Sequence, residues 1–414
     1  MNWLRIATQR FKPAAPLAFL FVVFSFYPAI VLVEVTQKGS SIRLYHVLAL
    51  LCLVQMLILG PPRWPGRARW VWSYFFVAAL SNGYVYWHAG FNKQFIQLPF
   101  AFLTFVFGLC LIRYFGGETV FVYFRKAAKL YLIVVAVKTV AYLPLFLRAA
   151  VVGQGAFYDV PWVSSGGPNI EATFCGIAAI FLLGDKRFWM ALAVSIAVSI
   201  LYQSRSGFIV CVLAAFFKFN RRPTVKQAFA AIVALALIAI VLIEVSTARD
   251  NIVARFFSIG SELDNDTVGR ALLWTNGFEL LLTHPWGSGI GNSFHLLEAD
   301  IGRALVENNF HNIYLQNAID GGIQSGILFA LVLLATIKTA LRSSGEHKVF
   351  GVALLAYAVT GFFQFVGYDV FGWLMIGICA TLNSERRLMA RRRRSLIARF
   401  ATGGPDRTWP KQTA

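Results

Sequence analysis

Apolar runs of about 20 residues recur along the chain and are separated by short polar stretches. A helix that crosses a bilayer needs ~20 predominantly apolar residues, so each run predicts one span. The predicted spans cover residues 14–33, 42–59, 70–88, 95–112, 127–147, 169–184, 187–203, 206–219, 226–245, 323–341, 349–367 and 370–383. The pattern predicts an all-α polytopic membrane protein with about twelve transmembrane helices, nine of them within residues 1–245 and three within 323–384.

Residues 246–322 form the one long interruption of this pattern. A connection of this length usually carries function and has helices of its own. Asp266 or Thr267 can cap a helix that runs to about Leu282. The segment HPWGSGIGNSF follows at 284–294, and its glycines permit tight turns that bring backbone N–H groups close to a ligand.

A second short helix is predicted near the end of this segment. Asn309 is a suitable N-cap, the run from Phe310 to Asp320 reads as a helix, and two glycines stop it before the next span. His311 would then lie in the first turn, where the helix dipole disfavours the protonated ring. A neutral imidazole suits a general base, although a capping or packing histidine gives the same pattern.

Composition agrees with a membrane protein. Hydrophobic residues make up 58% of the chain, charged residues make up 14%, and the mean hydropathy is +0.64. The net charge of +19 would suit a nucleic-acid partner. With the N-terminus placed inside, however, 28 basic and 5 acidic residues fall on the inner side, against 10 and 14 on the outer side. This asymmetry follows the positive-inside rule, so we expect a basic cytoplasmic tail at 385–414 that binds lipid head groups and no nucleic acid.

The sequence offers little sign of metal or disulfide chemistry. All five cysteines fall inside predicted spans, with no zinc-binding spacing and no disulfide framework. The segment ELDND at 262–266 has alternating acidic residues that could chelate a divalent cation, but it also reads as a solvated loop that ends in a helix cap. We therefore expect no metal and no cofactor.

Arg205 lies between two spans that are too close together for a real loop, and the topology places that turn on the outer side. An arginine at the membrane boundary needs a partner, and its guanidinium fits phosphate oxygens bidentately. Snorkelling to the interface is the alternative. Arg205, Arg270 and His311 share the outer compartment, where two cations and a neutral base suit a phosphate leaving group and a hydroxyl nucleophile. The reaction that fits is transfer of a sugar from a lipid-linked diphosphate, with inversion at the anomeric carbon.

Three segments in this order resemble the bacterial O-antigen ligase and polymerase superfamily: SRSG at 204–207, GRALLW at 269–274 followed by HPWGSGIGNSF, and HNIYLQ at 311–316 followed by DGG. The resemblance implies a metal-independent GT-C type glycosyltransferase in the bacterial inner membrane. Its active site would face the periplasm in the loop 246–322, with both termini in the cytoplasm. It also implies an undecaprenyl-diphosphate-linked glycan as donor and lipid A-core oligosaccharide as acceptor.

Ligase is favoured over polymerase because the chain has one large outer loop, and over protein O-oligosaccharyltransferase because no exported domain follows the last span. As substrate contacts we expect Arg148, Arg303, Asn312, Gln316, Trp274, Gly289 and Gly291. Lys138, near the middle of the fifth span, and Glu171, near the outer end of the sixth, can form an ion pair. A lipid-linked glycan transporter is the alternative of another class, but its ionisable residues would gather at the bilayer midplane.

Overall fold

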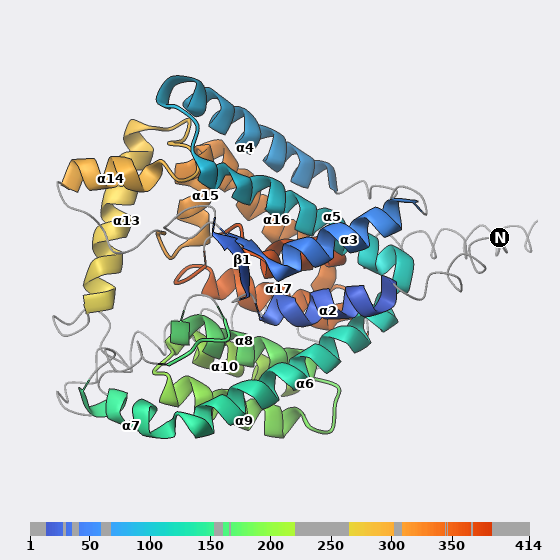
Figure 1. Cartoon of the computed structure of the whole chain (residues 1–414). Coiled ribbons are helices and arrows are strands. Elements are labelled where there is room, and N and C mark those ends of the chain that lie inside the picture. The colour runs from blue at the N-terminus through green and yellow to red at the C-terminus, as the bar shows by residue number, and fades with distance from the viewer. Residues whose placement is uncertain are drawn as a thin grey trace, which may run out of the picture.

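The computed structural model describes residues 14–27, 30–34, 41–58, 68–152, 160–164, 167–219, 265–301, 309–343, 345, 347–365 and 367–382. Over these residues the protein is mostly helical (Figure 1). The helices are α2 (Ala14–Phe26), α3 (Leu44–Ile58), α4 (Ala68–Ala89), α5 (Gln97–Phe115), α6 (Gly117–Ala141), α7 (Leu143–Val152), α8 (Gly167–Phe181), α9 (Phe188–Leu201), α10 (Arg205–Phe219), α13 (Asn265–Thr283), α14 (Ser293–Ile301), α15 (Ile313–Gly321), α16 (Ile323–Leu341), α17 (His347–Thr360) and the apolar helix Val370–Leu382. A 3₁₀ turn, η1 (Lys93–Ile96), leads into α5, and the strands β1 (Val31–Glu34) and β2 (Ser41–Arg43) pair antiparallel.

Each predicted span within the described residues overlaps a helix, whereas the span 226–245 lies outside them. By length and apolarity, Lys93–Phe115 and Ile323–Leu341 are the two described helices that can cross a bilayer, and several others are apolar but shorter. Large apolar side chains also face outward, including Phe76 and Leu334, each 64% exposed. An apolar surface of this kind is typical of a protein surrounded by lipid. The number of crossings stays a prediction.

The first predicted span is wrong at its C-terminal end. Helix α2 stops at Phe26, and Val31 to Glu34 form a strand instead. Pro28 disfavours a helical conformation at the residue before it, and the β-branched Val31 and Val33 favour a strand. The all-α prediction is therefore confirmed apart from this short sheet.

The fifth predicted span, 127–147, is also misplaced. Helix α6 begins ten residues earlier, at Gly117, and ends at Ala141. Its charged first half looked like a loop in the sequence, but Arg125 and Lys129 lie on the helix and pair with Asp185 at 2.8 and 2.6 Å. Asp185 belongs to the turn between α8 and α9, so these two ion pairs connect that turn to α6. The ammonium of Lys129 is the main reason that the pKa of Asp185 lies below its usual value.

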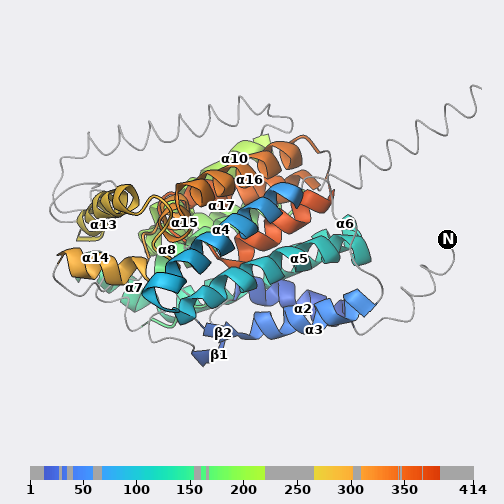
Figure 2. The same ribbon diagram turned by 90° about the horizontal axis from the view of Figure 1, so that it is seen from above.

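Backbone contacts between glycines bring the two halves of the chain together. A Cβ atom on Gly108 of α5 would lie 2.6 Å from the carbonyl oxygen of Leu374, so α5 and the helix Val370–Leu382 cross with their backbones touching. Helix α8 packs against α6, α9, α10 and α17. Viewed from above, the long helices α4, α5, α16 and α17 run along the body, and α13 and α14 lie beyond one end (Figure 2).

Several helix ends are joined by hydrogen bonds. The last turn of α6, the first turn of α8 and the turn between α9 and α10 are joined by side-chain contacts. The start of α15 is bound to the chain just after α17. We call these helix ends and the residues that join them the site end.

Candidate functional site

His311 lies just before helix α15. Asn312 is the N-cap of this helix, and its side-chain oxygen accepts the N–H groups of Tyr314 and Leu315, each at 3.0 Å. The prediction that Asn309 caps the helix and that His311 occupies its first turn is therefore wrong. Asn309 instead accepts the His311 N–H at 2.9 Å, because an asparagine side chain readily closes a turn onto the backbone two residues on.

The peptide that joins Phe310 to His311 is held on both sides. Its carbonyl oxygen accepts Trp274 Nε1 of α13 at 2.8 Å, and its N–H donates to Asn309. The Phe310 N–H donates to Gln316 Oε1 at 3.1 Å. His311 itself has φ of 51°, in the left-handed region that few residues other than glycine adopt. Such a conformation persists only where the surroundings impose it, and it is common at functional sites.

A buried carboxylate that the sequence analysis treated only as the end of a helix lies at the centre of this arrangement. Asp320 is 1% exposed, accepts Gln316 Nε2 at 2.8 Å and Ser293 Oγ at 3.1 Å, and is also hydrogen-bonded to Tyr368. Burial raises its pKa from 3.8 to about 7, and the hydrogen bonds oppose that shift. The signal that could have revealed it is an ionisable residue placed directly before an apolar span.

The glycine-rich turn closes onto the end of α15. Three of its glycines have positive φ, namely Gly287, Gly289 and Gly291. The Ser288 N–H donates to the Ile319 carbonyl at 2.7 Å, and the Gly289 N–H donates to the Asp320 carbonyl at 3.1 Å. These N–H groups therefore satisfy the C-terminal carbonyls of a helix, which would otherwise lack partners. Ligand binding by Gly289 and Gly291 stays a prediction.

Arg205 is the first residue of α10, as the close spacing of the two spans indicated. Helix α9 ends at Leu201, and Gln203 turns the chain with φ of 54°. Ser204 Oγ accepts the Gly207 N–H at 3.2 Å and so caps α10. The half-buried Arg205 thus directly follows a turn of only three residues.

The turn that follows α17 supports the starts of both α10 and α15. Gln364 accepts Ser206 Oγ at 3.1 Å and donates to Thr173 Oγ1 at 2.6 Å, and these contacts join it to α10 and α8. Three residues earlier, the Gly361 carbonyl accepts the Ile313 N–H at 2.8 Å. The helix starts beside the predicted arginine and the predicted histidine therefore share one support.

Backbone strain gathers around this support. In the part of the chain that the structure describes, three residues other than glycine have positive φ: Gln203, His311 and Phe365. The first precedes Arg205 by two positions, and the third follows the glutamine that contacts α10. Strained residues that share one support favour a functional site over an ordinary helix junction.

The structure describes some of the remaining predicted residues in full and others only in part. Trp274, Asn312 and Gln316 all bind backbone groups around His311, so they hold this turn whatever contact they make with a substrate. Arg148 and Arg270 lie on α7 and α13, but their side chains are outside the described residues, as is the whole of Arg303. Substrate contacts by these three arginines stay predictions.

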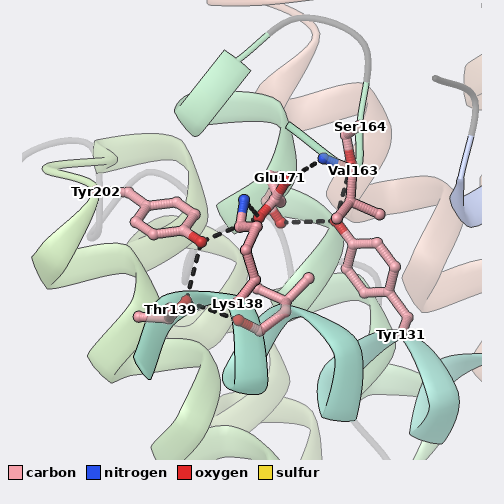
Figure 3. A network of polar contacts seen from close by, with 8 residues as sticks. Tyr131, Lys138, Thr139, Val163, Ser164, Glu171 and Tyr202 are labelled. Atoms are coloured by element: carbon pink, nitrogen blue, oxygen red, sulfur yellow. Dashed lines mark hydrogen bonds and ion pairs between the residues drawn. The ribbon is translucent and has the colours of Figure 1, made fainter. Parts of the chain in front are cut away.

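The suspected ion pair between Lys138 and Glu171 is confirmed (Figure 3). Lys138 is not near the middle of a span as predicted. It lies in the last turn of α6, because that helix ends at Ala141. Glu171 Oε1 accepts both Lys138 Nζ and the hydroxyl of Tyr202 (3.0 Å), while Oε2 accepts the Val163 N–H at 2.8 Å. The connection between α7 and α8 thus folds back onto Glu171 at residues 160–164.

The described residues contain no cluster of three or more His, Cys, Asp or Glu side chains that could hold a metal ion. The acidic segment 262–266, which the sequence offered as a possible divalent-cation site, has its acidic residues at 262 and 264 outside the described part of the chain. The side chain of Asp266 is not described either.

Comparison with known proteins gives a match over the segment that contains the candidate site. The family model described as O-antigen ligase matches residues 172–330, which include Arg205, the glycine-rich turn and His311. No curated protein and no solved structure matches the chain. The matched segment runs from α8 through α15 into α16 and so carries most of the strained turns. Over residues 172–330 the chain therefore resembles the O-antigen ligase and polymerase superfamily.

Proposed function

We propose that this protein is an O-antigen ligase. It transfers a glycan from undecaprenyl diphosphate to a hydroxyl group of lipid A-core oligosaccharide, on the periplasmic side of the bacterial inner membrane. His311 is the general base, and Arg205 and Arg270 bind the diphosphate. The observation that carries this proposal is the Phe310–His311 peptide, which is held in a strained conformation by hydrogen bonds on both sides within the segment that matches the family.

The reaction needs a base at a defined place. His311 removes the proton from the acceptor hydroxyl as its oxygen forms a bond to the anomeric carbon. The bond from that carbon to the diphosphate oxygen breaks, and undecaprenyl diphosphate leaves with the bonding electrons. Because the acceptor attacks opposite the leaving group, the anomeric configuration inverts. The guanidinium groups stabilise the charge that develops on the diphosphate, and no metal takes part.

The arrangement of the chain supports these roles. Arg205 begins α10 and His311 lies just before α15, and the positive end of a helix dipole favours an anion nearby. The starts of α10 and α15 are bound to the same turn after α17, so they are held in a fixed relation. A transporter would need its ionisable groups to change partners across the bilayer, whereas the described site-end carboxylates Glu171 and Asp320 each accept several fixed hydrogen bonds.

Reconstitution tests the proposal. Purified protein in detergent is mixed with lipid-linked glycan and lipid A-core, without ATP or a gradient, and a larger lipid A product is expected. The His311→Ala variant should lose about 10²- to 10⁴-fold in rate. The matched control is His295→Ala, because His295 is an exposed histidine on α14 in the same segment, and this variant should retain the wild-type rate.

The acceptor separates ligase from polymerase. Extension of lipid A-core supports the ligase, whereas extension of a second lipid-linked glycan would make the protein a polymerase. Substantial turnover by a well-folded His311→Ala protein would remove the general-base role. If donor and acceptor both bind and no product forms, the enzymatic proposal is wrong.

A further inference from the structure

The turn between α9 and α10 is short and strained, and it carries Arg205. From the end of α9 at Leu201, only three residues lead to the first residue of α10. Gln203 has φ of 54°, a left-handed conformation that is unfavourable for a residue with a side chain. Contacts elsewhere must therefore stabilise this turn, since the conformation is intrinsically unfavourable.

Tyr202 supplies those contacts. It is the C-cap of α9, and its N–H donates to the Val198 carbonyl at 2.9 Å. Its fully buried ring stacks on Phe146 with the ring centroids 4.6 Å apart, and it meets Trp162 edge-on at 5.3 Å. Its hydroxyl oxygen lies 2.9 Å from Thr139 Oγ1. The residue that begins the turn is thus anchored to α6, to α7 and to the connection that precedes α8.

The Tyr202 hydroxyl also donates to Glu171 Oε1 at 3.0 Å, and this carboxylate is held in turn by the ammonium of Lys138 (Figure 3). The ammonium lies over the rings of Trp162 and Tyr202, at 4.3 and 5.2 Å from their centroids. Both oxygens of the fully buried Glu171 are used, because Oε2 accepts the Val163 N–H. The acceptor of the tyrosine therefore has a single orientation.

An ion pair buried in this way contributes little net stability. Desolvation of two charges offsets most of their attraction, and apolar residues of similar volume are often as stabilising. A fully hydrogen-bonded pair does, however, fix the orientation of its side chains. Here the fixed Glu171 carboxylate holds the hydroxyl of Tyr202, which begins the turn before Arg205.

We propose that the Lys138–Glu171 ion pair is a positioning device for the diphosphate-binding arginine. It orients the hydroxyl of Tyr202, which fixes the turn between α9 and α10 and so places the guanidinium of Arg205 against the lipid diphosphate. The inference rests on the proposed role of Arg205. Glu171, Lys138 and Tyr202 are positioning residues and do not touch the substrate.

Two tyrosines in the same network allow a matched test. Tyr202→Phe and Tyr131→Phe each remove one hydroxyl from a fully buried ring near Glu171. The Tyr131 hydroxyl contacts Ser164 Oγ at 2.8 Å and the Glu171 carbonyl at 3.2 Å, and it has no bond to the turn. We expect similar losses of thermal stability in both variants, since each loses one buried hydroxyl.

Binding of undecaprenyl diphosphate then separates positioning from stability. Its dissociation constant is measured in detergent for both variants, each with Arg205 intact and with Arg205→Lys. Tyr202→Phe should weaken binding about tenfold when Arg205 is present, since a small misplacement of a binding group is costly. In the Arg205→Lys background the same change should weaken binding less than about twofold, because two residues that act through one contact are not additive. Tyr131→Phe should stay within about twofold in both backgrounds.

Other results of these binding measurements would overturn the positioning role. Equal weakening by the two tyrosine variants, or the same effect of Tyr202→Phe with and without Arg205, overturns the positioning role and leaves the proposed reaction standing. If Arg205→Lys alone leaves binding unchanged, Arg205 makes no bidentate contact with the diphosphate that Tyr202 could position, and the inference fails. If Tyr202→Phe does not fold, Thr139→Val removes the other hydroxyl contact of Tyr202 and should weaken binding in the same direction.

Discussion

Replacing Asp320 by asparagine should change how the stability of this protein depends on pH. Burial raises the pKa of this carboxyl group from 3.8 to about 7, so the folded protein holds the proton more tightly than the unfolded chain does. Its contribution to stability is full below about pH 4 and is lost as the pH rises through 7. Asparagine has no proton to lose, so Asp320→Asn removes this part of the pH dependence.

The size of the effect follows from the shift in pKa. A unit of pKa corresponds to about 1.4 kcal/mol, so the raised pKa accounts for at most roughly 4 kcal/mol between pH 4 and pH 7. Asparagine keeps one acceptor for Gln316, and the hydroxyls of Ser293 and Tyr368 can rotate to accept its amide protons. The variant should therefore differ from wild type by only about 1 kcal/mol at low pH and become the more stable protein above neutrality.

The assay is thermal unfolding in detergent, followed by tryptophan fluorescence between pH 4.5 and 8.5 for both proteins. The informative quantity is the midpoint of wild type minus that of Asp320→Asn, because other titrating groups cancel in this difference. It should fall steadily as the pH rises. Ser293→Ala is a matched variant, because the loss of a donor to the carboxylate raises the pKa of Asp320 further and extends the decline to higher pH. A difference that stays constant across the range would refute the reasoning.

Three further outcomes are expected. Arg205→Lys should lose nearly as much ligase activity as Arg205→Ala, because a lysine cannot bind phosphate oxygens bidentately; a fully active lysine variant would reduce the residue to a simple charge. A chelator should leave the initial rate unchanged, whereas loss of activity restored by Mg²⁺ or Mn²⁺ would point to a metal site at residues 262–266. Gly108→Ala should lower the unfolding midpoint because its Cβ would lie 2.6 Å from the Leu374 carbonyl. The expected loss in the free energy of unfolding is about 1–3 kcal/mol. Gly83→Ala, where the nearest described atoms are more than 4 Å away, should leave that midpoint unchanged or slightly raised.

Long apolar runs were sufficient to predict where the helices lie. The span predicted at 323–341 coincides with α16, because a glycine pair before it and basic residues after it mark both ends. The same criterion placed the start of α6 too late, because the first half of this helix is charged. Its Arg125 pairs with an acidic residue 60 positions away. Contacts at such a separation leave no mark in the local pattern.

In the candidate site, too, local patterns predicted some features, whereas features that depend on long-range contacts were missed. Local chemistry was sufficient to propose His311 and Arg205 as site residues, since each lies beside turn-forming residues between apolar segments. It assigned His311 to the helix instead of the turn before it, because Asn309 and Asn312 are both good caps and only packing decides between them. The position of Asp320 directly before an apolar span was a local signal, but its burial depends on residues from α14 and from the turn after α17, which lie far from it in the sequence.

The turn after α17 also has a consequence for biosynthesis. Ribosomes make the chain from its N-terminus, so both α10 and α15 exist before Gly361 and Gln364 are added. The last helix, whose backbone lies against α5, arrives later still. Until then the two halves of the site lack their common brace. Under the proposed mechanism, a nascent chain or a chain truncated before Gly361 would therefore be unable to hold the diphosphate and the acceptor together, and we expect it not to act on lipid-linked glycan before its insertion is complete.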